Sequence, residues 1–261
     1  MSRNSSKPRL RDRLRRVAAA VALPLWTVGS VFFIGQSIVV VVMLGSLVQI
    51  QFDDTQTEGG VFLALVSVLT YCIGLAILLI EPYAIRNMTR RQMRELLGLV
   101  RRPMIDDAVK AVLGWAGYFM AIALVANVVM WLLPQFNSDQ IQEIGFNTGG
   151  DVTEKISAFV VVVIAAPIVE EIVFRGYLQG SLRRFMPWWL GGVITSVAFG
   201  VVHGQWNVGI DVFILSMVAC YLRERTGAIW AGIGLHMIKN SIAYYILFWA
   251  PPWLVSLLGG P

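Results

Sequence analysis

Two adjacent glutamates, Glu170 and Glu171, stand within a long apolar run, in the segment APIVEEIVFR at residues 166–175. On a helix, adjacent side chains point about 100° apart, so the two acids must have different surroundings. Glu171 and Arg175 are four residues apart with the acid first, which is the favourable order for an ion pair on one helix face. We therefore predict that Glu171 pairs with Arg175 and that Glu170 faces a different partner.

Pro167 comes just before the two acids. Proline has no N–H, so inside a helix it leaves one carbonyl without its donor and tends to kink the chain. The α-helical spacing of four residues predicts that this carbonyl belongs to Val163. We expect the helix to bend shortly before Glu170.

The protein contains only 2 histidines, and each shares a predicted helix face with a residue four positions away. His203 follows Phe199 in the segment FGVVH, and Asn240 follows His236 in the segment HMIKN. Gly232 continues the His236 face, which leaves room beside the imidazole.

A glutamate, two histidines and an asparagine in a water-poor setting suit a small set of reactions. A desolvated carboxylate is a competent general base for water, and an imidazole can share the proton or orient the water. An imidazole and an Asn amide can donate hydrogen bonds to a developing oxyanion. A glutamate with two histidines is also a ligand set for zinc. The sequence has no GxSxG or HExxH motif, and Cys72 and Cys220 lie away from these residues, which disfavours covalent catalysis.

Membrane-spanning helices must position these residues. Hydrophobic residues make up 57% of the chain and charged residues only 14%, against about 25% charged in a globular domain. This excludes a soluble fold, a disordered chain and a solvent-exposed nucleic-acid binder. We predict an all-α polytopic integral membrane protein of about seven to eight transmembrane helices. The spans expected are Leu23–Gln49, Val61–Ile80, Ala111–Leu133, Ile156–Gln179, Pro187–His203, Val208–Leu222 and Ala228–Ala250.

The basic residues indicate how these spans are oriented. Of the 21 Lys and Arg residues, 18 fall in the N-terminal tail and in the loops after the second, fourth and sixth spans. The positive-inside rule then places the N-terminus in the cytoplasm and the C-terminus outside. The positive charge contacts anionic membrane lipids, and no nucleic-acid partner is expected. Counted along the helices from these loops, Glu170, His203, His236 and Asn240 fall in one layer, about 17–24 Å from the inner surface.

Two further polar features have open interpretations. The segment Pro82–Ala108 has periodic basic and apolar residues, which fits either an amphipathic helix on the inner leaflet or an ordinary solvated helix. Lys239 lies deep in the last span. Its ammonium group pairs with Glu171 or Asp211, or its stem extends toward the surface.

The three motifs resemble the signature of the CAAX-protease and bacteriocin-processing (CPBP or Abi) family of intramembrane proteases, which is EExxxR, FxxxH and HxxxN. They stand here at 170–175, 199–203 and 236–240, in the family's order and each on its own predicted span. The resemblance covers about residues 155–250. It implies a four-helix catalytic core in the C-terminal half, built around a membrane cavity, and hydrolysis of a peptide bond within or at the membrane.

The resemblance also implies roles for individual residues. Glu170 with His203 would activate the water, and His236 with Asn240 would hold the oxyanion. The supporting residues would be Glu171, Arg175 and Phe199. A metal-free glutamate mechanism and a zinc site formed by Glu170, His203 and His236 both remain open. Asn240 favours the metal-free mechanism, because an amide is a poor metal ligand and a good oxyanion donor.

The implied substrate is a membrane-associated peptide or protein, with or without a lipid attached. The expected location is the plasma membrane of a prokaryote. We divide the chain into a basic cytoplasmic tail (1–22), N-terminal transmembrane helices with a basic loop (23–150), a CAAX-protease-like core (151–250) and a C-terminal tail (251–261). Two alternatives are a non-catalytic immunity or scaffolding protein of the same family and an ion-coupled transporter. The lack of a sequence repeat disfavours the transporter.

Overall fold

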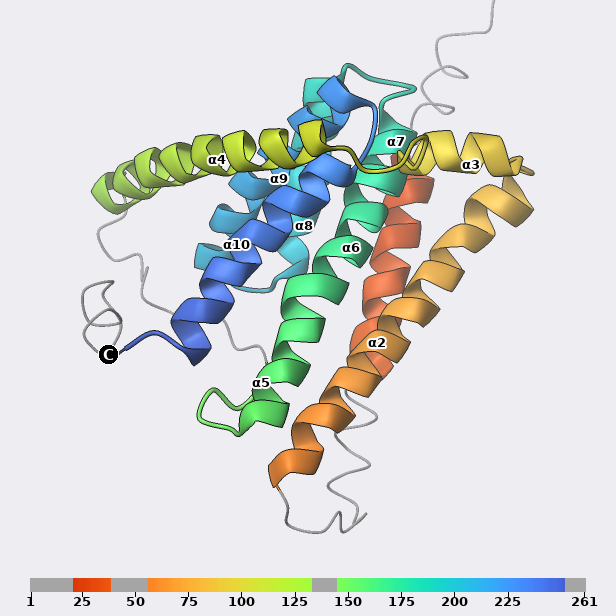
Figure 1. The fold of residues 1–261 in the computed structure, drawn as a ribbon. Coiled ribbons are helices and arrows are strands. Elements are labelled where there is room, and N and C mark those ends of the chain that lie inside the picture. The colour runs from red at the N-terminus through yellow and green to blue at the C-terminus, as the bar shows by residue number, and fades with distance from the viewer. Residues whose placement is uncertain (1–20, 39–55, 133–144, 252–261) are drawn as a thin grey trace, which may run out of the picture.

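The computed structural model describes residues 21–38, 56–132 and 145–251, and this part of the chain is all-α, with no strand. Its first helix is Val21–Ile38. Figure 1 shows how the elements are arranged, with α2 and α6 running roughly alongside each other and α4 running transverse to them, next to α9 and α10. The elements after the first helix are α2 Gln56–Ile80, η1 Glu81–Ile85, α3 Arg90–Leu97, α4 Ile105–Leu132, α5 Val152–Ala158, η2 Phe159–Ala165, α6 Ala166–Glu171, η3 Ile172–Leu178, α7 Gln179–Leu182, α8 Trp188–Val202, α9 Trp206–Thr226 and α10 Trp230–Phe248.

The predicted all-α polytopic membrane fold is confirmed. Four described helices are long and apolar enough to cross a membrane, and they are Val21–Ile38, Gly60–Ile85, Ile105–Leu132 and Val152–Leu182. The α8 helix is apolar but shorter, as the sequence predicts for the fifth span. Every predicted span coincides with a helix, although the first is described only as far as Ile38. The predicted basic tail, except for its last two residues, and the C-terminal tail from residue 252 lie outside the described residues.

The fourth span is a composite helix that alternates between α and π geometry. The elements α5, η2, α6, η3 and α7 follow one another without a break from Val152 to Leu182. A π turn holds one more residue than an α turn, and such turns often occur at functional sites. The short α6 segment carries Pro167, Glu170 and Glu171 between the two π segments. Pro167 lies in its first turn, where a missing N–H is tolerated best.

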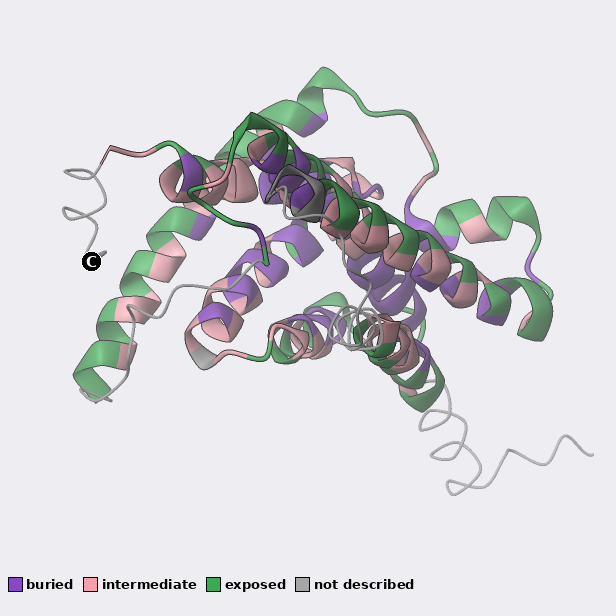
Figure 2. Cartoon of the chain, turned by 90° about the horizontal axis from the view of Figure 1, so that it is seen from below, coloured by how far each residue is buried: buried purple, intermediate pink, exposed green. Residues whose placement is uncertain are grey.

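The largest buried cluster lies where η3 and α8 meet the first helix and α2. Phe174, Tyr177 and Phe199 are fully buried there, and Figure 2 shows the buried residues on the inward sides of the helices. A polar contact reinforces this packing, because the Tyr177 hydroxyl donates a 2.9 Å hydrogen bond to the buried carboxylate of Glu81 in η1. The Arg86 Nε atom lies 2.5 Å from the same carboxylate group. These contacts join the end of α2 to the fourth span.

The α3 helix is shorter than the segment predicted from the sequence, and its apolar side faces the protein. Leu96 and Leu97 are buried, and their backbone carbonyls lie against Gly176 and Gly180, where a Cβ atom would collide with them. The two glycines are four residues apart, so they form a small-residue groove of the kind that lets membrane helices approach closely. Packing on the fourth span therefore accounts for the apolar end of α3, whereas Tyr83, Ile85 and Ile105 of the segment Pro82–Ala108 are exposed.

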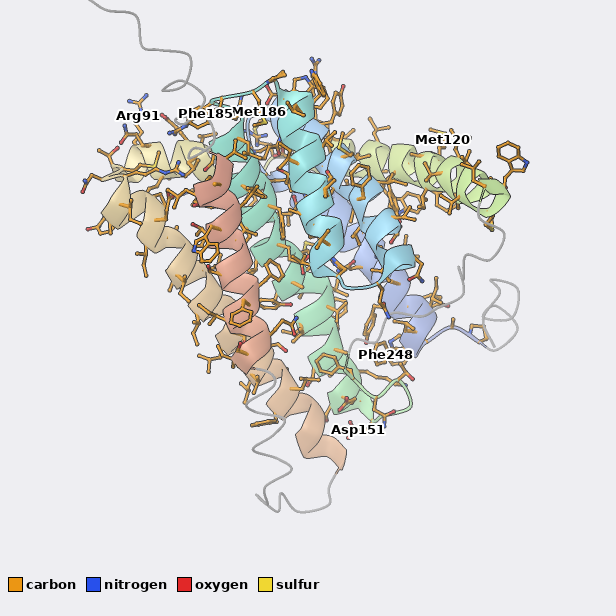
Figure 3. The ribbon with its side chains drawn as sticks, turned by 180° about the vertical axis from the view of Figure 1, so that it is seen from behind. Arg91, Met120, Asp151, Phe185, Met186 and Phe248 are labelled. Carbon is orange, nitrogen blue, oxygen red and sulfur yellow. The ribbon has the colours of Figure 1, made fainter. Side chains whose placement is uncertain are left out.

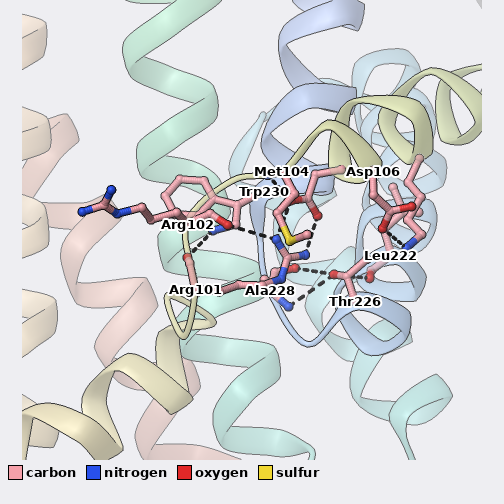
Figure 4. Close-up of polar contacts among 10 residues, drawn as sticks. Arg101, Arg102, Met104, Asp106, Leu222, Thr226, Ala228 and Trp230 are labelled. Carbon is pink, nitrogen blue, oxygen red and sulfur yellow. Dashed lines mark hydrogen bonds and ion pairs between the residues drawn. The ribbon is translucent and has the colours of Figure 1, made fainter.

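One end of the bundle gathers most of the described basic loops, and we call it the basic end. The Arg223 guanidinium lies there and donates to the carbonyls of Glu95 and Leu96, both at 3.2 Å, and to Gly227 at 2.7 Å. Figure 4 shows the neighbouring contact, in which the Trp230 indole donates to the Arg101 carbonyl at 2.8 Å. Figure 3 shows Arg91, Phe185 and Met186 at this end and Asp151 toward the opposite end.

Candidate active site

The supporting ion pair predicted from the i,i+4 spacing is present and completely buried. Arg175 Nη1 lies 2.9 Å from Glu171 Oε1, and both side chains have no exposed surface. The guanidinium also stacks on the Phe199 ring, with Cζ 4.4 Å from the ring centroid. A buried arginine needs such partners because an isolated charge in an apolar interior is very costly. Glu171, Arg175 and Phe199 thus form one contact group across the fourth span and α8.

His236 lies between the two acids of the EExxxR motif. Its Nδ1 atom is 3.3 Å from Glu171 Oε1, and its Nε2 atom is 3.7 Å from Glu170 Oε2. Gly232, one turn earlier on α10, makes this approach possible, because a Cβ atom there would lie 2.7 Å from Glu171 Oε2. The room that the sequence analysis expects beside the imidazole is therefore occupied by the Glu171 carboxylate. Glu170 and Glu171 have different surroundings, as predicted.

His203 is held in one orientation by the residue that precedes it by one turn. Its Nδ1 atom lies 2.7 Å from the Phe199 carbonyl oxygen, and a carbonyl can only accept, so Nδ1 carries the proton. In the neutral ring this leaves Nε2 as a free proton acceptor. The ring also packs edge-on against Phe199, with centroids 4.8 Å apart. Phe199 packs edge-on against His236 as well, at 5.8 Å, so one aromatic ring contacts both histidines.

Asn240 makes a contact that the sequence analysis did not foresee. Its side-chain amide donates a 2.8 Å hydrogen bond to the backbone carbonyl of Val162. In the π segment η2, the Ala166 N–H bonds to Val161, and the next residue, Pro167, has no N–H to offer to Val162. The α-helical spacing predicts that Pro167 frees the carbonyl of Val163, whereas the five-residue spacing of the Ala166 bond, continued to Pro167, points to the carbonyl of Val162. Asn240 supplies the missing donor.

A cavity of about 370 Å³ lies beside Glu170 and His203, and both residues line it. Its other walls come from the helix Val21–Ile38, from α2 and from the neighbouring turns of α6, η3 and α8. Glu170 is partly accessible there, with 18% of its side chain exposed, whereas Glu171 is inaccessible. The cavity therefore selects one acid of the pair as the group that can meet a ligand.

The residues that the sequence analysis missed are on the cavity wall. Ser67, Thr70 and Tyr71 of α2 and Gln36 of the first helix line it together with Glu170. They carry no recognisable motif, and single hydroxyl side chains are common in membrane helices. The available signal was their spacing. Thr70 and Tyr71 follow Ser67 by three and four residues, so each lies on the same side of α2 as Ser67.

The remaining polar residues of the last spans form a separate group. Lys239 Nζ lies 3.2 Å from Asp211 Oδ2, and the Tyr118 hydroxyl also bonds to Asp211. Of the partners considered for Lys239, the structure selects Asp211. Among the described residues, no group of three or more His, Cys, Asp and Glu side chains is arranged to hold a metal ion. The set Glu170, His203 and His236 does not fit a metal site in this arrangement, and we derive no step through a metal.

The described part of the chain is thus an all-α membrane bundle in which Glu170 and His203 line one cavity, and His236 lies beside Glu170 without lining that cavity. Residues 152–242 match the family described as type II CAAX prenyl endopeptidase Rce1-like. All three motifs lie inside this region. The resemblance of this region to the CAAX-protease family, which the three motifs predict, is thereby confirmed.

Two curated relatives each match about a third of the chain. A Bacillus subtilis (strain 168) protein named "Putative membrane peptidase YdiL" is 32% identical over 92 residues, which cover 35% of this chain and 38% of that protein. An Escherichia coli protein named "Uncharacterized 24.3 kDa protein" is 30% identical over 96 residues, which cover 35% of this chain and 44% of that protein. The match thus spans less than half of either relative. No solved structure matches the chain.

Proposed function

We propose that this protein is an intramembrane endopeptidase that hydrolyses a peptide bond of a membrane-associated peptide or protein. The observation that carries the proposal is the placement of Glu170 and His203 on one cavity within the helices, with His236 3.7 Å from Glu170. The family match over residues 152–242 supports the same reaction class.

In this mechanism Glu170 and His203 activate a water molecule. The Glu170 carboxylate takes one proton from the water, while His203 Nε2 accepts the hydrogen bond that orients it. The hydroxide adds to the scissile carbonyl carbon and forms a tetrahedral intermediate. The proton then passes from Glu170 to the leaving amine nitrogen as the C–N bond breaks, which returns the carboxylate to its starting state.

His236 and Asn240 hold the oxyanion of the intermediate. His236 Nδ1 faces Glu171, so Nε2 can donate to the oxyanion only when both ring nitrogens carry a proton. One N–H of the Asn240 amide is engaged by Val162, and the second N–H is the one that serves the oxyanion. Donors fixed in this way need no reorganisation during the reaction. Glu171 and Arg175 act by orienting His236, and Phe199 by supporting both histidines.

The topology that we propose has the basic end in the cytoplasm of a prokaryotic cell. The N-terminus is then cytoplasmic and the C-terminus lies outside. The support is the collection of basic loops at one end of the bundle and the acidic Asp151 toward the other. Membrane lipids are the surrounding partners, and the substrate is a peptide or a protein, lipidated or not.

The decisive test is a comparison of protein termini in cells that express the wild type or the Glu170→Ala variant. New C-termini should appear with the wild type and disappear with Glu170→Ala. The purified protein should cleave a reporter peptide that spans such a site, and His203→Ala should abolish turnover while the protein stays folded. Glu95→Gln, on exposed α3, is the matched acidic control and should retain full turnover. Undiminished cleavage by both site variants would disprove the assigned roles, and a fully functional Glu170→Gln variant in cells would favour the non-catalytic alternative.

A further inference from the structure

The cavity beside Glu170 is lined by two parts of the chain, one inside and one outside the region that matches the family. One wall belongs to the motif-bearing helices, and the other belongs to the helix Val21–Ile38 and α2, which lie outside the matched region 152–242. We call the helix Val21–Ile38 and α2 the N-terminal helix pair. Whatever occupies the cavity next to Glu170 must touch this pair as well.

The wall contributed by α2 is polar, although α2 is otherwise apolar. Between Gly60 and Ile80 the helix has three hydroxyl side chains, Ser67, Thr70 and Tyr71, and all three line the cavity. The outward side of α2 carries exposed apolar residues such as Leu65 and Leu69. The hydroxyl face is thus turned toward Glu170 and away from the surrounding lipid.

The Thr70 hydroxyl has no hydrogen-bond partner among the described residues, although its oxygen is inaccessible. Hydroxyl side chains in helices usually bond to the carbonyl four residues earlier, and Thr27, Ser37 and Ser241 of this protein do so. Thr70 instead turns its methyl group toward Gly35 of the first helix, where a Cβ atom would lie 3.2 Å away. An unpaired buried hydroxyl is unfavourable, so a ligand gains affinity if the Thr70 side chain rotates about its Cα–Cβ bond and presents the hydroxyl to a polar group in the cavity.

The chemical character of the lining defines the ligand class. Apart from Glu170 and His203, the polar groups are neutral hydroxyls and the amide of Gln36, and no Lys or Arg belongs to the described lining. Such a surface does not select a carboxylate or a phosphate. It matches the amide groups of a peptide backbone. The apolar part of the lining, which includes Val31, Phe32 and Val173, matches aliphatic side chains.

We infer that the cavity between the N-terminal helix pair and Glu170 binds an extended, uncharged peptide segment, whose backbone is hydrogen-bonded by the hydroxyl face of α2. This inference rests on the proposed function for the reaction at Glu170, and on the cavity lining for the ligand. Thr70 is a positioning residue for the substrate, and Ser67 lies on the same face one turn earlier. The N-terminal helix pair therefore forms the substrate-binding wall of the site.

The first experiment measures occupancy without any cleavage. Ser67→Cys is made in a Cys72→Ser background that also carries Glu170→Gln, reconstituted in liposomes and labelled with N-ethylmaleimide. The capped peptide acetyl-Ala-Val-Leu-Val-Ala-amide should slow labelling at least about fivefold. The same peptide with a central Asp or Lys should not protect. Arg91→Cys in the same background, at a side chain of α3 that is 90% exposed, should label equally with and without peptide. Lack of labelling at Ser67→Cys, or lack of protection by the uncharged peptide, would overturn the inference.

The second experiment separates binding from turnover with the reporter peptide described above. Thr70→Val removes the hydroxyl and keeps the shape, so KM should rise about fivefold, as expected for one neutral hydrogen bond, with little change in kcat. Thr195→Val on α8 is the matched control, because its hydroxyl is also buried and unpaired but does not line the cavity, and both constants should stay unchanged. An unchanged KM for Thr70→Val also overturns the inference. Protection without any cleavage would instead retain the binding site and reject the endopeptidase.

Discussion

The side-chain amide of Asn240 on α10 donates a 2.8 Å hydrogen bond to the backbone carbonyl of Val162 in the fourth span. Pro167 leaves this carbonyl without a backbone donor, because Ala166 already bonds to Val161 and Pro167 has no N–H. Two residues far apart in the sequence are therefore coupled through one carbonyl group, just before the turn that carries Glu170.

This coupling can be measured with a double-mutant cycle on stability. Asn240→Ala should lower the free energy of unfolding by about 1–3 kcal/mol, because the Val162 carbonyl stays buried without a donor. In the Pro167→Ala background the new N–H can bond to Val162, so the same Asn240→Ala change should cost clearly less. Thermal unfolding in detergent checks both. Asn127→Ala is the control, because that amide bonds only within its own exposed helix turn, to Ala123. Equal costs in the two backgrounds would refute the coupling.

Removal of one partner of the buried pair Glu171–Arg175 should strongly destabilise the protein. Arg175→Met leaves the Glu171 carboxylate buried without its cation, and the expected cost is about 3–5 kcal/mol. The double variant Glu171→Gln, Arg175→Met should be less damaging than Arg175→Met alone, because no unpaired charge remains. Unfolding temperatures of the wild type, Arg175→Met and the double variant decide this.

A matched pair elsewhere in the chain tests whether burial is the cause. Arg91 and Glu95 have the same i,i+4 spacing and a 3.0 Å separation, but their side chains are 90% and 52% exposed. Arg91→Met should leave the unfolding temperature unchanged, because water and salt screen exposed pairs. Similar losses for Arg91→Met and Arg175→Met would show that spacing alone, without burial, sets the effect.

Gly232 should tolerate no side chain, although glycine is otherwise a poor residue for a helix. A Cβ atom there would lie 2.7 Å from Glu171 Oε2, so Gly232→Ala must displace the carboxylate that faces His236. We expect a loss of about 1–3 kcal/mol in stability, together with reduced turnover of the reporter peptide. Gly117→Ala on α4 is the control, because nothing lies within 4 Å of its Cβ position, and it should be neutral or slightly stabilising. A neutral Gly232→Ala would contradict the close approach.

Replacement of Phe199 should disturb the positions of both histidines at once. Phe199→Leu removes the ring that stacks on Arg175 and packs against His203 and His236, so turnover of the reporter peptide should fall at least about tenfold as the two imidazoles lose their support. Phe119→Leu makes the same change at an exposed ring on α4 and should leave turnover unchanged. Equal turnover of Phe199→Leu and the wild type would show that the aromatic contacts do not position the histidines.

The sequence was sufficient for the helices and for contacts within a helix, because both depend on local patterns. Each span is an apolar run, four of the described helices are of membrane length, and the Glu171–Arg175 pair follows from a spacing of four residues. Contacts between helices were harder to predict from the sequence. For Lys239 the sequence left Glu171 and Asp211 open, since the choice of Asp211 depends on how α9 packs against α10.

Two features of the site depend on geometry that the sequence pattern does not encode. The π turns around α6 are not visible in an apolar run, so the sequence points to the carbonyl of Val163, whereas the bond from Ala166 to Val161 in the structure points to that of Val162. The cavity lining from α2 was missed because Ser67, Thr70 and Tyr71 are ordinary residues for a membrane helix. Only the position of α2 next to Glu170 gives them a possible role.

The two π segments also determine how the chain can change in length. A π turn already contains one extra residue, so deletion of a single residue from η3 can be absorbed by a return to α geometry without breaking the helix. A deletion between Glu171 and Arg175 would leave the two residues three positions apart instead of four, and so would change the geometry of their buried contact. Loss of one codon between them would therefore give a protein that still inserts and folds as a helix but holds its buried ion pair differently, so selection on the site would be visible as a fixed spacing of these two residues.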